Sequence, residues 1–216
     1  EASRNPQFVF SFSGDPELVR AVEQAWPDRS EEAAWILDQL EETLEINRLY
    51  VSGKGFESNR VRAKGFRADF LRHWQAADRT NGAPRLMAKL GASHLVRGRN
   101  SNGVFDLGTT LHEVAALEGR PVLSLMVLPG ENTKVALFDP TTLSFRDGPA
   151  KDGYGEGMDV FYEAAFETGF TLFDLRPLRP LLARNSDPEL SELIRTVHGF
   201  DHLLIMTGST ASSDLN

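Results

Sequence analysis

The apolar run PVLSLMVL, at residues 121–128, is the feature that most constrains the fold of this chain. Only a serine interrupts it. A strand that is apolar at almost every position usually has both faces buried, which is typical of a parallel sheet covered by helices. A second run of this kind, FDHLLIMTG, occupies residues 200–208. The two runs therefore favour an α/β fold built on a parallel sheet.

The rest of the chain alternates between strand and helix patterns. Further strands are predicted at residues 7–12, 85–90 and 170–175, and a hairpin is predicted within residues 134–147. Helices are predicted to begin at Pro16 and to span residues 30–51, 60–78 (with an interruption near Gly65), 108–118, 158–169 and 187–199. The expected architecture is a mostly parallel central sheet flanked by helices in three layers, within a single α/β domain of residues 1–216.

The composition argues against several classes of protein. The net charge of −8 argues against nucleic-acid binding, which usually relies on a basic face. The absence of cysteine excludes disulfides and thiolate metal sites, and leaves both cytoplasmic and periplasmic compartments open. No apolar run approaches the ~20 residues of a membrane span. The expected partner is a small-molecule substrate.

The stretch GASHLVRGRN, at residues 91–100, is the first candidate for a functional site. It follows a predicted strand, and ligands of an open α/β sheet bind where the carboxyl ends of the strands meet. His94 is a side chain that can exchange a proton near neutral pH or ligate a metal. Arg97 and Arg99 can hold a carboxylate or phosphate. The structural alternatives are a capping histidine and two ordinary surface charges.

Other charged residues are expected at the same edge of the sheet. Lys89 either reaches the substrate from the end of its strand or pairs with an acid on a neighbouring strand. Two roles are open to Asp106, which can cap the helix that follows it or accept a hydrogen bond from the ring of His94. Asp174 and Arg176 end another predicted strand, as substrate-binding residues or as a structural pair.

The remaining histidines give weaker signals. His112 lies on a predicted helix but lacks a partner three or four residues away, the spacing of a metal-binding pair. His73 is interpreted as packing, and His198 and His202 flank a helix-to-strand turn, where a histidine can interact with the helix carboxyl end. Nucleophile-elbow, P-loop, dinucleotide-binding and HExxH motifs are absent from the sequence. The residues alone thus predict a site around His94 but no specific reaction.

Four short motifs resemble those of one known family. The stretches RLMAKLGASHLVRG, FDLGTTLHE, FTLFDLRPLRPLL and GFDHLLIMTGST together resemble the C-terminal half of erythromycin esterase-like proteins. That family belongs to a superfamily with the Tiki and TraB proteins and with haem-binding iron-uptake lipoproteins, in which a Gly-x-x-His motif follows a central strand. Here the motif falls on Gly91 and His94. The resemblance implies a hydrolytic, metal or haem site at one edge of an α/β sheet.

A second family motif, Gly-Glu with a nearby His-Gly, is missing from this sequence. In the esterase-like members it supplies the general base. The chain begins at Glu1 rather than at a methionine, so the expectation is that it is the C-terminal portion of a longer chain whose N-terminal segment carries this motif. The other interpretation is a divergent form without the hydrolytic machinery.

The function that the resemblance implies is hydrolysis of an ester, lactone or amide. His94 would transfer a proton or ligate a divalent metal, Arg97 would hold an anionic group, and Asp106 would orient His94. One alternative is a non-catalytic module of the same superfamily that binds haem or a metal ion, with His94 and His112 as candidate ligands. The other is a structural domain in which the GASH turn is only the exit of a strand.

Overall fold

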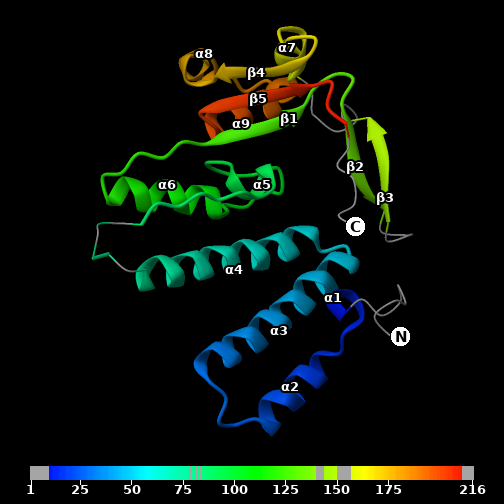
Figure 1. Cartoon of the computed structure of the whole chain (residues 1–216), viewed down its shortest axis with the longest axis vertical. Coiled ribbons are helices and arrows are strands. Elements are labelled where there is room, and N and C mark those ends of the chain that lie inside the picture. Colours follow the sequence, from blue (N-terminus) through cyan, green and yellow to red (C-terminus); the bar gives the residue numbers. More distant parts are fainter. Residues whose placement is uncertain are drawn as a thin grey trace. The chain divides into compact units, whose positions relative to one another are not determined.

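The computed structural model describes residues 10–77, 79–80, 82, 84–139, 144–149 and 157–210. The chain forms two compact units (Figure 1). Unit 1 comprises residues 1–87 and 101–104, and unit 2 comprises residues 88–100 and 105–216. The described elements of unit 1 are helices, whereas unit 2 combines strands with short helices.

Unit 1 is built around two long helices. Its elements are α1 (Phe10–Ser13), α2 (Pro16–Ala25), α3 (Glu31–Val51) and α4 (Gly55–Ala76). Gly53 turns the chain between α3 and α4 with a φ of +74°, a conformation that favours glycine. The buried side chains Val19, Leu37 and Leu44 pack α2 against α3.

Side-chain caps set the helix starts that the sequence predicts. The Asp15 carboxylate accepts a hydrogen bond from the Glu17 amide before α2, and the Ser30 hydroxyl accepts one from the Ala33 amide before α3. The predicted interruption of the next helix is wrong, because α4 continues through Gly65. A Cβ at Gly65 would lie 2.9 Å from the carboxyl carbon of Glu42, so this glycine leaves room for the Glu42 side chain and does not break the helix.

Unit 2 contains a three-stranded sheet and a separate hairpin. Its elements are α5 (Ala92–Leu95), α6 (Leu107–Leu117), β1 (Leu125–Pro129), β2 (Lys134–Asp139), β3 (Ser144–Pro149), α7 (Asp159–Glu163), β4 (Gly169–Asp174), a 3-10 turn (Arg176–Leu178), α8 (Arg179–Leu182), a second 3-10 turn (Pro188–Leu190), α9 (Ser191–Gly199) and β5 (His202–Thr207). The sheet order is β1-β5-β4. Strand β5 pairs with β1 in parallel and with β4 antiparallel. The predicted hairpin is confirmed as β2 and β3.

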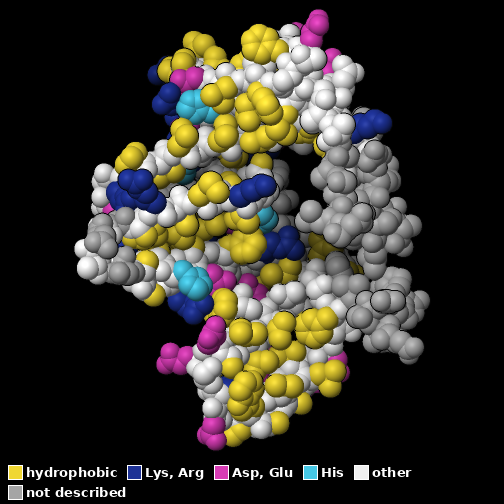
Figure 2. All heavy atoms as spheres, viewed as in Figure 1, with side chains coloured by type: hydrophobic (Ala, Val, Ile, Leu, Met, Phe, Trp, Pro, Cys, Tyr) yellow, Lys and Arg dark blue, Asp and Glu magenta, His cyan; other side chains and the backbone are white. Residues whose placement is uncertain are grey.

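One face of this sheet carries the core of unit 2. Met126, Leu128, Leu203 and Ile205 belong to a buried cluster that also includes side chains of α7 and α9. The opposite face is apolar but exposed: Leu125 is 42% exposed, Val127 45%, Phe170 67% and Leu172 61%. Figure 2 shows apolar side chains at the surface of this part of the chain.

The predicted three-layer fold with a mostly parallel central sheet is therefore wrong. The sheet has three strands in mixed orientation, and only one of its faces is buried. The apolar runs are strands, as predicted, but an unbroken apolar pattern does not guarantee a second covering layer. None of the helices in the described part of the chain combines the length and apolar character needed to cross a bilayer.

Two other predicted strands are not found within the described residues. Residues 7–9 lie outside the described part, and residues 10–13 form the helical turn α1, closed by a hydrogen bond of 2.8 Å from the Gly14 amide to the Phe10 carbonyl. The described residues 84–90 form no regular structure, and Met87 is 90% exposed there. These short apolar stretches have no described neighbouring strand to satisfy their backbone groups, so local pattern alone does not hold them extended.

Candidate functional site

His94 lies on α5 and is held by a buried carboxylate. Its Nδ1 atom lies 2.8 Å from Oδ2 of Asp106, at the start of α6. The Asp106 side chain is 2% exposed, whereas that of His94 is 21% exposed. The predicted hydrogen bond between these two residues is confirmed.

Asp106 performs both of the roles that the sequence left open. Its Oδ1 atom accepts a hydrogen bond of 2.7 Å from the Leu107 amide and thereby caps α6. Its Oδ2 atom accepts a hydrogen bond from Nδ1 of His94. A carboxylate that fixes Nδ1 in this way sets the tautomer and orientation of the ring, so proton exchange falls to Nε2.

The sequence FDLGTT keeps α6 close to the segment that carries His94. A Cβ at Gly108 would lie 2.7 Å from the Val96 carbonyl oxygen and closer still to the carbonyl group of Leu95. Thr109 then bonds the backbone of Gly98 twice, accepting from the amide at 3.0 Å and donating to the carbonyl at 3.2 Å. The close approach of α6 to this segment therefore depends on the lack of a side chain at Gly108 and on the hydroxyl group of Thr109.

Arg97 does not contribute to the His94–Asp106 pair. It contacts a separate group of residues that the sequence did not predict to lie together. Its Nη2 atom donates to Oδ1 of Asp201 at 3.1 Å, and Arg179 donates to the same oxygen at 2.8 Å. The other carboxylate oxygen accepts a hydrogen bond of 3.0 Å from the Ser124 amide. His112 completes the group, with Nε2 lying 3.2 Å from the Ser124 hydroxyl. We call these five residues the arginine–aspartate cluster.

The cluster lies where β1 and β5 begin. Ser124 directly precedes β1, Asp201 directly precedes β5, and the two strands run parallel from there. The sequence predicted a site at the carboxyl ends of parallel strands, whereas this cluster lies at the amino ends of β1 and β5. The segment 85–90, whose end was to position His94, is not a strand.

Two residues of the cluster, Asp201 and His112, have shifted pKa values. Burial by itself would raise the pKa of Asp201, but hydrogen bonds from Arg179, the Ser124 amide and Arg97 outweigh burial and lower that pKa to about 2. Burial lowers the pKa of His112, and the positive charges of Arg97 and Arg179 lower it further against the opposing effect of Asp201. At neutral pH the cluster therefore holds an ionised aspartate and a neutral histidine.

The lowered pKa of His112 predicts a loss of stability in mild acid. Its folded-state pKa lies below the unfolded value, so the folded state resists protonation. The free energy of unfolding should fall as the pH drops from about 6.5 toward the lowered pKa. Urea titrations at pH 7.5 and 5.5 measure this fall, which should be smaller in His112→Gln. An equal fall in both proteins would contradict the prediction.

The residues predicted to bind substrate do not gather at His94. Lys89 is exposed on the irregular segment before α5. The Arg99 guanidinium carbon lies 5.5 Å from the centre of the Phe105 ring, a cation–π contact. Arg176 binds both carboxylate oxygens of Asp174 at 2.8 Å on the surface and lowers the pKa of that aspartate. The structural alternative suits this last pair better than substrate binding.

Ser124, Arg179 and Asp201 were not singled out from the sequence. A usable signal was present, because Ser124 and Asp201 are polar residues within the two apolar runs. Alignment of the two runs as parallel neighbours, with Leu125 opposite His202, would have placed these residues side by side. Arg179 carried no such signal, since it follows β4 by a few residues and reaches the cluster only through the fold.

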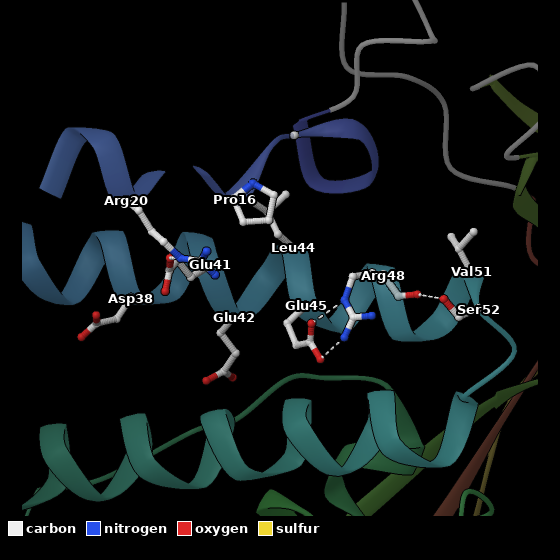
Figure 3. A pocket seen from close by; sticks show the side chains of 11 residues that line it. Pro16, Arg20, Asp38, Glu41, Glu42, Leu44, Glu45, Arg48, Val51 and Ser52 are labelled. Carbon is white, nitrogen blue, oxygen red and sulfur yellow. Dashed lines mark hydrogen bonds and ion pairs between the residues drawn. The ribbon is translucent and has the colours of Figure 1, made fainter. Parts of the chain in front are cut away.

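Unit 1 contains a groove of about 800 Å³ along α3 (Figure 3). Its charged side chains are largely paired: Arg48 binds both carboxylate oxygens of Glu45 at 2.7 Å, and Arg20 binds Glu41 at 3.2 Å. Burial and the nearby Asp69 raise the pKa of Glu42, while Lys64 opposes them. The described residues that line the groove include no histidine. The groove therefore offers internal ion pairs rather than a set of groups for catalysis.

No group of three or more histidine, aspartate or glutamate side chains converges as metal ligands within the described residues. The hydrogen bond from Nδ1 of His94 to Asp106 is also typical of metal-ligating histidines, so metal ligation by His94 stays a prediction. The haem-binding alternative stays a prediction.

Comparisons of the chain with protein-family models, with curated proteins and with solved structures find no match. The resemblance to erythromycin esterase-like proteins therefore stays a prediction. The site is defined by its own geometry, which is a histidine oriented by a buried carboxylate in unit 2.

Proposed function

We propose that the chain carries a hydrolytic site at His94, which activates water against an ester, lactone or amide bond of a small molecule. The observation that supports this proposal best is the hydrogen bond between Nδ1 of His94 and the buried Asp106 carboxylate. A histidine held in this way is a common form of general base. The resemblance to erythromycin esterase-like proteins points to the same chemistry.

The proposed reaction uses the two nitrogens of the ring differently. Asp106 accepts the hydrogen bond from Nδ1 and stabilises the positive charge that the ring gains. Nε2 of His94 takes a proton from water as the water oxygen attacks the carbonyl carbon. The same proton is then delivered to the leaving alcohol or amine as the tetrahedral intermediate collapses. Arg97 is not assigned to the reacting carbonyl, because Asp201 holds its guanidinium.

Replacement of His94 by alanine is expected to lower kcat/KM for a responsive substrate by about 100-fold or more, since general-base catalysis contributes 10²–10⁴. Initial rates with a panel of chromogenic esters, lactones and anilides measure this loss. His73→Ala is the matched control, because His73 is an exposed histidine of unit 1. The proposal is wrong if the wild-type chain turns over no member of the panel, or if turnover survives His94→Ala.

Asp106→Asn tests the orientation of the ring separately from the helix cap. Asparagine is as good an N-cap residue as aspartate, so α6 should remain intact. An amide holds the imidazole less firmly, and kcat/KM should fall by about 10–100-fold. Far-ultraviolet circular dichroism checks the helix, and the ring nitrogen shifts of His94 report the tautomer. Unchanged activity together with a changed tautomer would exclude a role of Asp106 in the reaction.

A further inference from the structure

We infer that Arg97 and Arg179, held together by Asp201, bind the carboxylate or phosphate group of a small-molecule ligand. This inference goes beyond the proposed hydrolysis, because binding of a free anion requires no reaction at His94. It concerns the arginine–aspartate cluster at the beginning of β1 and β5.

The cluster contains two positively charged arginines but only one negatively charged aspartate. Two guanidinium groups donate to one oxygen of Asp201, and the other oxygen of this carboxylate is engaged by the Ser124 amide. The remaining bonds of Arg179 go to the neutral carbonyl oxygens of Val197 and Phe200. One carboxylate thus faces two cations, which leaves a surplus charge of about +1 for an oxyanion to balance.

Arg97 has donor capacity that the fold does not use. Its Nε atom is buried and has no hydrogen-bond partner among the residues that the structure describes. Because Nε is covered, an anion would have to bind the part of the guanidinium group that solvent reaches. The Arg97 side chain is still 33% exposed and that of Arg179 26%, so the two guanidinium groups remain within reach of solvent.

The two arginines are positioned before any ligand arrives. The Arg97 amide donates to the Gly199 carbonyl at 3.1 Å, which ties the backbone of Arg97 to the end of α9. Arg179 is fixed by three hydrogen bonds, to Val197, Phe200 and Asp201. Preorganised donors lose little conformational entropy on binding, which favours affinity for a small anion.

His112 couples anion binding to protonation. The charged groups that act on it are Arg97, on the segment after α5, Arg179 on α8, and Asp201 before β5. The two arginines disfavour the protonated ring, and a bound anion would offset their charge. The pKa of His112 should therefore rise when the anion binds, so binding takes up a proton and strengthens as the pH falls below neutrality.

Isothermal titration of the 216-residue chain with sodium sulfate and with sodium formate tests the inference. Both anions keep their charge between pH 5.5 and 7.5, and they separate a tetrahedral, phosphate-like preference from a planar, carboxylate one. Saturable binding of at least one anion is expected, with about tenfold or more weaker affinity in Arg97→Gln. Arg176→Gln is the matched control, because it removes an arginine that is paired with Asp174 at the surface.

His112→Gln tests the coupling. Titrations in buffers of different ionisation enthalpy should show proton uptake by the wild-type protein and none by His112→Gln, while binding itself persists. If the pKa of His112 rises by one unit on binding, the wild-type affinity well below both pKa values should exceed the affinity well above them by about tenfold. The inference fails if neither anion binds saturably, or if Arg97→Gln and Arg176→Gln weaken binding equally. Anion binding without proton uptake would show that His112 is not coupled to the anion site.

These outcomes are distinguishable from failure of the proposed hydrolysis. His94→Ala should leave sulfate and formate binding unchanged, because His94 makes none of the hydrogen bonds of the cluster. A protein that binds anions but cleaves no ester would overturn the proposed function alone. A protein that cleaves esters but binds no anion would overturn this inference alone.

Discussion

Asp201→Asn is expected to reduce the free energy of unfolding of unit 2 by about 3 kcal/mol, because it removes the charge that two half-buried arginines share. The amide keeps the shape of the carboxylate but replaces one acceptor with a donor. That donor must face either the two guanidinium groups or the Ser124 amide, which are all donors. Urea unfolding at pH 7 measures the loss.

The matched control for this substitution is Asp174→Asn. Asp174 also bonds an arginine through both carboxylate oxygens, but this pair is exposed, and water replaces its hydrogen bonds at little cost. The free energy of unfolding of Asp174→Asn should therefore stay close to that of the wild type. Equal stability of Asp201→Asn and the wild type would show that the cluster does not hold unit 2 together.

Gly108→Ala is expected to destabilise unit 2 by about 2 kcal/mol through overpacking. The added methyl would lie 2.7 Å from the Val96 carbonyl oxygen and closer still to Leu95, and both obstacles are backbone atoms that cannot rotate away. Helix propensity alone predicts the opposite sign, a gain of about 1 kcal/mol for alanine over glycine. The sign of the change therefore decides between close packing and propensity.

A second readout of Gly108→Ala is the hydrogen bond between His94 and Asp106. Separation of α6 from α5 should lengthen it, and the ring nitrogen shifts of His94 should then report a mixture of tautomers. Gly91→Ala is the matched control, since a Cβ there would have only an ordinary contact of 3.9 Å with His94. An alanine at Gly108 that left both stability and tautomer unchanged would contradict the packing described for α5 and α6.

The candidate site was predictable where it depends on short stretches of sequence. Asp106 precedes an apolar helical pattern, so its capping role follows from local chemistry, and its proximity to His94 was one of two roles considered. The arginine–aspartate cluster was not predictable in the same way. Ser124 and Asp201 are far apart in the chain, and only the parallel register of β1 and β5 brings them together.

The sequence by itself determined the capped helices of unit 1, the strands within the two long apolar runs and the hairpin of β2 and β3. Each is indicated by periodicity, capping or turn residues within a short window of the sequence, although tertiary packing supplies most of the stability of such elements. The tertiary structure decided the antiparallel direction of β4, the exposed second face of the sheet and the partner of Arg97. These features depend on which distant segments meet, because burial and hydrogen-bond satisfaction are settled by the whole unit rather than by its parts.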